Sequence, residues 1–229
     1  MRIGLFGGAF DPVHIGHLNI ANQSAEKFGL GRVYFIPTAV PPHKKKGGAD
    51  PADRLKMVRL AVSSNPVFTV SLREMAEDGP SFTIDTVSWF QKRHGASLYY
   101  ILGSDAFEDL HKWKSSGEML FMCNFIVVSR PGSDMDSVQK KVSGRLRACG
   151  VALTPKKKSA DAIADRVLSV PGSPFSVHIC KFPEFGVSST EIRHRAGLGK
   201  SLRYLVPDSV GQYIRKNGLY SKVGKGRNG

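Results

Sequence analysis

The fold is decided by the stretch Gly7-Gly8-Ala9-Phe10-Asp11-Pro12-Val13-His14-Ile15-Gly16-His17. A short apolar run, Ile3 to Phe6, precedes this stretch and predicts a buried strand. The residues that follow have apolar side chains at helical spacing and run from His17 to Phe28. The sequence therefore predicts a strand, a glycine turn and a helix in direct succession.

The glycine turn and the helix start have the chemistry of an anion site. The glycines let backbone N–H groups approach a ligand closely. The beginning of the helix supplies free N–H donors and the positive end of the helix dipole, which together suit a phosphate. Because His14 and His17 are three residues apart, both imidazoles can face the same point at the helix start. We therefore expect a phosphate group to bind here.

The same stretch resembles the HxGH signature of the nucleotidylyltransferase superfamily, and its full form resembles the nicotinate-nucleotide adenylyltransferase branch. Two other interpretations stay open on the residues alone. One is a metal site with Asp11 as a third ligand beside the two histidines, and the other is a solvated helix start without a role. The stretch is not the G-x-G-x-x-G fingerprint of dinucleotide binding, because the glycines at 4, 7 and 8 have a different spacing.

Length and composition indicate one domain. A chain of 229 residues with an apolar fraction of 41% can build a single α/β core. It contains no apolar run that approaches a membrane span, and its N-terminus lacks a secretory pattern, so we expect no membrane partner. Cys123, Cys149 and Cys180 are odd in number and far apart. This argues against a disulfide framework or a CxxC metal site and favours a cytoplasmic location.

The chain is strongly basic. Lys and Arg number 33 against 19 Asp and Glu, which gives a net charge of +14. Such a balance predicts anionic partners, either nucleic acid or phosphorylated small molecules. The basic residues are scattered, and no zinc-finger spacing, RNP-like aromatic pattern or helix-turn-helix signal is present. The charge alone leaves both classes of partner open.

Strands and helices alternate along the chain, which predicts a parallel sheet. We expect a Rossmann-like α/β fold with helices on both faces and a small C-terminal helical part. The further expected strands are 33–36, 67–71, 98–102, 125–128 and 175–180. The further expected helices are 52–63, one that begins near Thr83, 134–148, 160–168 and one that begins near Pro207. We expect residues 1–220 to form the single domain, with 185–220 as its C-terminal helical part. Residues 133–174, which include a predicted surface link at 154–158, are expected to be an elaboration atypical of the family. Residues 221–229 are predicted to be a disordered basic tail.

Several segments between the two ends of the chain resemble the family's substrate-binding segments. Lys44 follows Pro-Pro-His, as in the family's PPHK substrate loop. Residues 81–86, Ser-Phe-Thr-Ile-Asp-Thr, resemble the segment beside the pyridine carboxylate, where helix-start amides are donors; Ser81 or Thr83 could also cap that helix. Trp113 has a flat face for a pyridine ring and, among Lys112, Lys114 and Ser115, should be partly exposed.

Polar residues follow two further expected strands, 98–102 and 125–128, and add to the predicted substrate-binding residues. Asp105, in Gly103-Ser104-Asp105, follows an expected strand and suits a pair of ribose hydroxyls. Arg130 follows the next strand, where its planar guanidinium could hold a phosphate. Both positions match the family pattern.

A second phosphate motif lies near the C-terminus, in Ser188-Ser189-Thr190-Glu191-Ile192-Arg193. Ser188 and Glu191 have the spacing of a capping box, with two further hydroxyls and Arg193 in the first turn of the helix. The segment resembles the superfamily's ISSTxIR signature, with Val187 in place of the usual isoleucine.

The ordered set of motifs implies that the adenylyl group of ATP is transferred to nicotinate mononucleotide, which gives nicotinate adenine dinucleotide and pyrophosphate. The resemblance implies that the catalytic residues are His14, His17 and Arg193. It implies that the ATP-binding residues are Gly7, Gly8, Phe10, His14, His17, Gly103, Asp105, Ser188, Ser189, Thr190 and Arg193. It implies that the mononucleotide-binding residues are Lys44, Thr83, Asp85, Thr86, Asp105, Trp113 and Arg130. The implied cofactor is Mg²⁺ bound through the ATP phosphates, with no metal site made of protein ligands.

Alternative functions stay open from the sequence. A related transferase could act on nicotinamide mononucleotide or phosphopantetheine through the same ATP site. A basic nucleic-acid-binding module with a vestigial nucleotide site is supported by the charge, but the complete set of motifs argues against nucleic acid as the partner. The sequence also leaves open whether the protein is a homo-oligomer.

Overall fold

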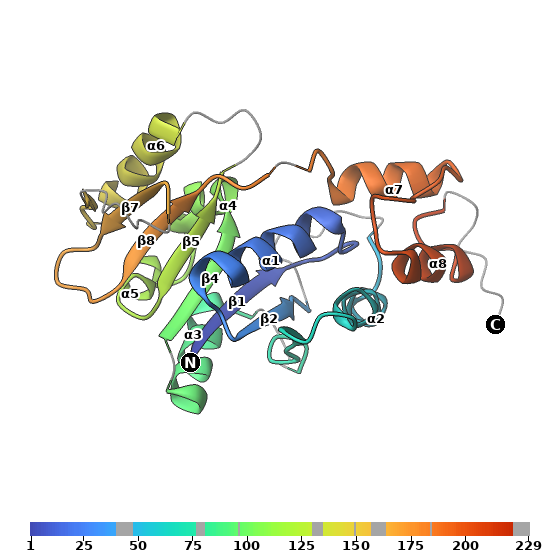
Figure 1. Cartoon of the computed structure of the whole chain (residues 1–229), viewed down its shortest axis with the longest axis horizontal. Helices are drawn as coiled ribbons and strands as arrows, with labels where there is room; N and C mark the ends of the chain where they lie inside the picture. Colours follow the sequence, from blue (N-terminus) through green and yellow to red (C-terminus); the bar gives the residue numbers. More distant parts are fainter. Residues whose placement is uncertain are drawn as a thin grey trace.

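The computed structural model of the chain describes residues 1–39, 48–76, 81–95, 97–129, 135–148, 150–156, 164–183 and 185–221. The strands form one sheet in the order β3-β2-β1-β4-β5-β8-β7-β6. This sheet runs through the molecule with helices on both sides (Figure 1). The predicted α/β class is therefore confirmed, as is the C-terminal helical part.

The strands are β1 Arg2–Gly8, β2 Arg32–Pro37, β3 Phe68–Val70, β4 Ser97–Gly103, β5 Asn124–Val128, β6 Thr154–Pro155, β7 Arg166–Ser169 and β8 Ser176–Cys180. The helices are α1 Ile15–Phe28, α2 Pro51–Val62, α3 Thr83–His94, α4 Ser104–Glu108, α5 Ser116–Met119, α6 Met135–Ala148, α7 Ser189–Gly197 and α8 Asp208–Lys216, with a 3₁₀ turn, η1, at Leu110–Lys112.

The β1–α1–β2 unit has the predicted form. Strand β1 pairs in parallel with β2 on one side and with β4 on the other. Helix α1 ends at Gly29, whose φ of 59° is the left-handed conformation that glycine adopts without strain. Because the chain runs from β1 to β3 in one direction and returns to β4 on the other side of β1, the strand order reverses between β1 and β4. In such sheets the crevice beyond the carboxyl ends of these strands is where ligands bind.

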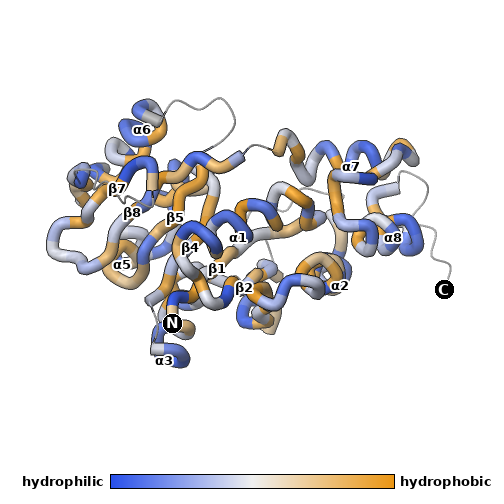
Figure 2. The backbone as a smooth tube through the Cα atoms, viewed as in Figure 1, coloured by the Kyte–Doolittle hydropathy of each residue, from blue (hydrophilic) through white to orange (hydrophobic). Residues whose placement is uncertain are grey.

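Two apolar clusters lie on opposite faces of the sheet. One joins α1, α2, α7 and α8 to the sheet, and the other joins α3, α5 and α6 to it. Strand β5 is apolar and buried from Phe125 to Val128, as expected for a parallel strand covered on both faces (Figure 2). The two layers fix the strand ends relative to the helix starts that flank the crevice.

The predictions for 133–174 are partly wrong. Helix α6 is where it was expected. Of the helix predicted at 160–168, residues 160–163 lie outside the described residues, and 166–168 belong to β7, which pairs antiparallel with β8. The predicted surface link contains β6, which pairs antiparallel with β7. Leu168 of β7 is buried against the sheet, so pairing with the open edge of β8 overrides the weak local helical pattern. The sheet is therefore parallel except for this extension.

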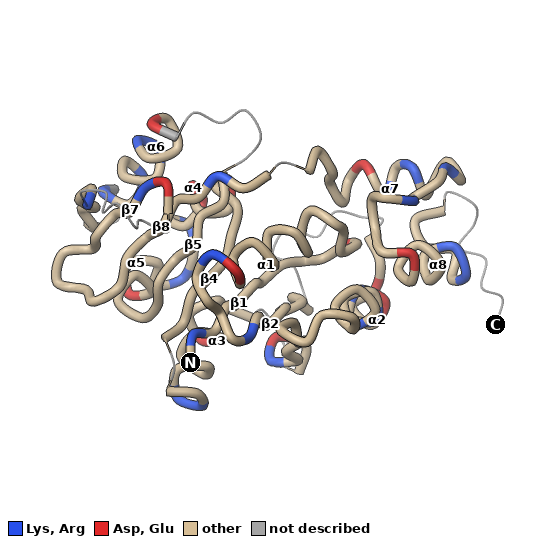
Figure 3. The backbone as a smooth tube through the Cα atoms, in the orientation of Figure 1, with Lys and Arg blue, Asp and Glu red and all other residues tan. Residues whose placement is uncertain are grey.

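Basic side chains are spread over several elements, as expected from the sequence. Lys and Arg residues lie on α6 at one end of the molecule and on α7 and α8 at the other end (Figure 3). In the part of the chain that the structure describes, no helix is both long and apolar enough to span a membrane.

Candidate active site

The imidazoles of His14 and His17 cap the beginning of α1. The Nδ1 atom of His14 accepts from the backbone N–H of His17 at 3.4 Å, and the Nδ1 atom of His17 accepts from the backbone N–H of His14 at 3.2 Å. The two rings stack with their centroids 3.6 Å apart. Because each Nδ1 is an acceptor, a neutral imidazole here carries its proton on Nε2. Each histidine therefore presents one N–H donor on the edge away from the backbone.

Both imidazoles are neutral near pH 7. Burial lowers the pKa of His14 to about 4. Burial, together with the proximity of His14, lowers the pKa of His17 well below its ordinary value. The pair can therefore donate hydrogen bonds to phosphate oxygens without adding positive charge.

Neighbouring residues explain why the two rings lie as they do. A Cβ at Gly16 would come within 3.0 Å of His14 Nδ1 and 3.1 Å of Val187, so a larger residue would require the imidazole or Val187 to shift. Phe10 lies in the core with its ring against His17, at 5.2 Å between centroids. Phe10 is also predicted to bind ATP, and its buried ring supports the His17 imidazole.

Most of the predicted free N–H donors at the beginning of α1 are already used. The amides of His14 and His17 donate to the imidazoles, and the amide of Ile15 donates to the carbonyl of Leu205 at 3.0 Å. For these three amides the prediction of free donors is wrong. The donors that α1 offers to a phosphate are thus mainly the imidazole Nε2–H groups.

The two phosphate motifs meet in the fold although they come from opposite ends of the sequence. Arg193 Nη1 donates to the carbonyl of Asp11 at 2.6 Å, and Ser189 Oγ donates to the carbonyl of Pro12 at 2.9 Å. Ser188 caps α7 by accepting from the amide of Glu191 at 3.2 Å, as its spacing predicted. The C-terminal motif is therefore docked on the turn that precedes His14.

The carboxylate of Asp11 accepts hydrogen bonds from groups of the protein itself. Its Oδ1 accepts from the hydroxyl of Tyr220 at 2.7 Å and from the amide of Ala49 at 3.0 Å. Among the described residues, no group of three or more His, Cys, Asp or Glu side chains could hold a metal ion. Asp11, His14 and His17 do not form such a group.

Tyr100 links three of the predicted binding segments, although sequence reasoning missed it. Its hydroxyl is hydrogen-bonded to Thr83, at the beginning of α3. A side chain at Gly7 would come within 2.5 Å of that hydroxyl, so the end of β1 passes directly over it. The ring of Trp113 meets the ring of Tyr100 edge-on, with centroids 6.0 Å apart, and is half-buried as predicted. Gly7, Thr83 and Trp113 are thus brought together.

The beginning of α3 differs from the prediction. Helix α3 starts after Phe82 without a side-chain cap, and Ser81 Oγ donates instead to the carbonyl of Glu74. Thr86 Oγ1 donates to the buried carboxylate of Glu74 at 2.9 Å, and the amides of Asp85 and Thr86 donate to the carbonyl of Phe82. The side chain of Thr86 is therefore engaged in the core. The candidate backbone donors move to the first residues of α3, Thr83 and Ile84.

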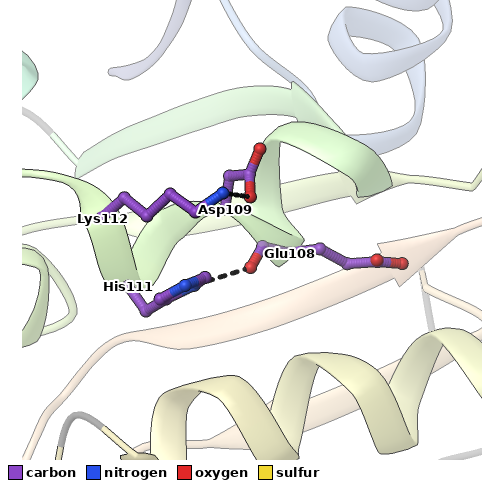
Figure 4. A network of polar contacts seen from close by, with 4 residues as sticks. All are labelled: Glu108, Asp109, His111 and Lys112. Atoms are coloured by element: carbon purple, nitrogen blue, oxygen red, sulfur yellow. Dashed lines mark hydrogen bonds and ion pairs between the residues drawn. The ribbon is translucent and has the colours of Figure 1, made fainter.

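The segment between Asp105 and Trp113 is braced by local contacts. Lys112 Nζ lies 2.7 Å from Asp109 Oδ1, and His111 Nδ1 lies 2.9 Å from the carbonyl oxygen of Glu108 (Figure 4). Gly103 at the end of β4 leads into α4, where Asp105 is exposed in the first turn. These contacts help to hold the segment that joins the two predicted binding residues.

Lys114 is a second residue that sequence reasoning missed. Its Nζ lies 3.4 Å from Asp85 Oδ2 and 4.4 Å from the centre of the Phe82 ring. It therefore joins the segment of Trp113 to the beginning of α3. Its position directly after Trp113 was the available signal. Two other predicted residues, Lys44 and Arg130, lie outside the described residues.

Comparisons with known proteins show the family to which the chain belongs. Residues 5–195 match the family described as cytidylyltransferase-like. The chain is 39% identical over 228 residues to a probable nicotinate-nucleotide adenylyltransferase of Pelobacter propionicus, covering 97% of this chain and 99% of the relative. It is 37% identical over 221 residues to the nicotinate-nucleotide adenylyltransferase of Bacillus subtilis, covering 96% and 98%.

The fold is similar to a solved structure. Nicotinic acid mononucleotide adenylyltransferase of Plasmodium falciparum, complexed with NaAD, superposes with a TM-score of 0.69 at 16% identity, covering 96% of this chain and 97% of that one. At this identity the likeness concerns the fold.

Proposed function

Because the chain belongs to the cytidylyltransferase-like family and, within it, to the nicotinate-nucleotide adenylyltransferases, we propose that it transfers the adenylyl group of ATP to nicotinate mononucleotide. The products are nicotinate adenine dinucleotide and pyrophosphate. The choice of substrate rests on the names of the relatives, and the assignment of catalytic roles rests on the geometry of the site.

The observation that carries the proposal is the docking of the 188–193 motif on the turn before His14. It puts the Arg193 guanidinium, which donates to Asp11, and the beginning of α7 on the same turn as the imidazole pair. A triphosphate carries several negative charges along its length, so it needs cations and N–H donors from more than one element. The crevice beyond β1 and β4 provides both.

The reaction requires positioning and charge stabilisation. A 5′-phosphate oxygen of the mononucleotide attacks the α-phosphorus of ATP, a P–O bond forms, and the bond to the bridging oxygen breaks with its electron pair leaving on pyrophosphate. The attacking oxygen is already ionised, so no general base is needed. We assign the Nε2–H of His14 to the α-phosphate oxygens and that of His17 to the β-phosphate and bridging oxygen. Arg193 and the α7 amides hold the leaving phosphates.

The mononucleotide occupies the side of the crevice formed by β4 and α3. Trp113 stacks on the pyridine ring, and Asp105 accepts from ribose hydroxyls. The amides of Thr83 and Ile84 receive the pyridine carboxylate. Lys44 and Arg130 bind the 5′-phosphate.

Mg²⁺ is the proposed cofactor, and the described residues suit an ion held through the ATP phosphates. The side chains beside the imidazole pair are hydroxyls and a guanidinium, and the nearby Asp11 carboxylate is engaged by Tyr220 and Ala49. Mg²⁺ keeps several water ligands and commonly binds through substrate phosphates. When bound, it would neutralise triphosphate charge.

An assay of product formation tests the proposal. The protein is incubated with ATP, Mg²⁺ and nicotinate mononucleotide, and both pyrophosphate and the dinucleotide are measured. We expect both in equal amounts. Pyrophosphate release with nicotinamide mononucleotide or phosphopantetheine, but not with the nicotinate form, would contradict the assignment of the substrate.

We also place the protein in the cytoplasm, which suits its buried, unpaired Cys123 and Cys180.

A further inference from the structure

The side chain of Arg54 connects the two loops that meet at the crevice. Arg54 lies on α2 and is only 2% exposed. Its Nη1 donates to the carbonyl of Ala9 at 2.6 Å, and its Nη2 donates to the carbonyls of Thr38 at 2.7 Å and Ala39 at 2.9 Å. Ala9 lies in the phosphate turn after β1, whereas Thr38 and Ala39 directly follow β2. One guanidinium thus spans the ends of two adjacent strands.

The turn after β1 also binds the chain just before α2, at Gly48 and Ala49. The carboxylate of Asp11 accepts from the amide of Ala49, and a side chain at Gly48 would collide with that carboxylate. Residues on both sides of 40–47 are therefore tied to the turn, by Arg54 before this segment and by Asp11 after it. Asp11 belongs to the turn itself, whereas Arg54 reaches the turn from α2.

A buried guanidinium is a costly way to pack a helix. Burial lowers the pKa of Arg54, an effect that the nearby carboxylates of Asp11 and Asp50 oppose. The hydrogen bonds of its guanidinium go to the neutral carbonyls of Ala9, Thr38 and Ala39, so no direct ion pair in this set offsets the desolvation cost. An apolar side chain of similar length would pack α2 at lower cost. The geometry of the guanidinium, with two nitrogens that face two loops, is what an apolar residue lacks.

We propose that Arg54 is a positioning residue for adenylyl transfer, which fixes the distance between the ATP-binding turn and the residues after β2 that lead into the mononucleotide side. This inference rests on the proposed function. Because Arg54 is buried and its guanidinium donates to backbone carbonyls, it acts on the alignment of the two phosphates through the loops that it joins. In-line attack is sensitive to such alignment, since a displacement of about 1 Å can cost about 10²-fold in rate.

Steady-state kinetics of Arg54→Lys and Arg54→Met test the proposal, with Arg59→Met, an exposed arginine of the same helix, as the matched control. We expect kcat to fall about 10²-fold in both Arg54 variants while the KM values change less than about threefold. Lysine should not restore kcat, because a single ammonium nitrogen cannot face both loops. The control should keep wild-type kcat. All assays run well below each variant's melting temperature.

Chemical rescue separates positioning from folding. In Arg54→Ala, added methylguanidinium should restore part of kcat with saturation, whereas methylammonium at the same concentration should not. Wild-type kcat in the Arg54 variants, or a loss that only follows the folded fraction, would overturn the proposal. Failure of every variant to fold, the lysine variant included, would also overturn it. The wild-type assay tests the proposed function separately: if another mononucleotide is the substrate, the ratio of variant to wild type is measured with that one.

Discussion

His14 and His17 hold each other in place: each imidazole accepts the backbone N–H of the other residue, and the rings stack at 3.6 Å between centroids. This arrangement fixes both tautomers before any ligand binds. Two Nε2–H donors are thus presented at one point of the crevice. Removal of one imidazole takes away both a phosphate donor and the cap of its neighbour's amide.

Replacement of His14 by alanine should therefore lower kcat by roughly 10²–10³-fold, as for loss of one preorganised donor in a transition state. The KM for the mononucleotide should change little, because His14 lies on the ATP side. Steady-state kinetics at saturating ATP measure both values. Near-normal turnover of His14→Ala would contradict the assignment.

The low histidine pKa values predict how stability depends on pH. The pKa of His14 and that of His178 are both lowered to about 4 by burial, below the unfolded value of 6.5. Between these values the unfolded chain binds more protons, so the free energy of unfolding rises with pH in this window and falls as the solution is acidified. For His14 alone the effect is of order 3 kcal/mol. Urea unfolding from pH 4 to 7.5 should show a smaller dependence in His14→Gln than in the wild type.

Nicotinate and nicotinamide mononucleotides should be strongly discriminated. The amides of Thr83 and Ile84 favour a carboxylate, whereas the NH₂ of an amide would face other donors, a mismatch that can reach about 10⁴-fold. The ratio of kcat/KM for the two substrates measures it. Trp113→Ala should raise the KM for both without reversing their order. Similar kcat/KM values in the wild type would mean that the carboxylate pocket lies elsewhere.

Lys114 should contribute to this preference. Its ammonium lies beside Phe82 and Asp85 at the beginning of α3, so Lys114→Met should lower the nicotinate-to-nicotinamide ratio several-fold. Lys112→Met is the matched control, because Lys112 pairs with Asp109 in the same segment. Equal ratios in the two variants would exclude this role.

Tyr220→Phe should destabilise the fold by about 1–2 kcal/mol, because it removes a donor from the Asp11 carboxylate. Denaturant unfolding measures the change. Tyr213→Phe serves as its control, since Tyr213 donates at 2.8 Å to Asp53, away from the phosphate turn. Only the Tyr220 variant should also lower kcat, and an unchanged kcat would contradict a link between Asp11 and the site.

Elemental analysis checks the metal prediction. We expect purified protein to carry no stoichiometric zinc and to need only added Mg²⁺ for activity. Zinc that is lost together with activity on chelation would overturn this expectation.

The sequence was sufficient for elements that depend on local signals. Gly29 and the apolar spacing of α1 predicted a helix, and Ser188 with Glu191 predicted a cap; each is a short-range relationship. The contacts of Arg54 and Tyr220 involve partners far along the chain, which no local pattern reveals. Arg54 did leave a signal, because it lies one turn before Val58 on the inward face of α2, where a charge is uncommon. Strand β7 was missed since its partner, β8, determines its conformation.

The hydrogen bonds that dock the C-terminal motif and Tyr220 on the turn before His14 join residues separated by 177, 182 and 209 positions. During synthesis on a ribosome, the N-terminal turn and its histidines emerge long before Arg193 and Tyr220 are made. The nucleotide site is thus incomplete in every nascent chain until the last helices have been translated. A chain that terminates before Arg193 lacks the residues that dock on the N-terminal turn, even if its first strands fold. We therefore expect adenylyl transfer only from chains whose translation has passed these residues.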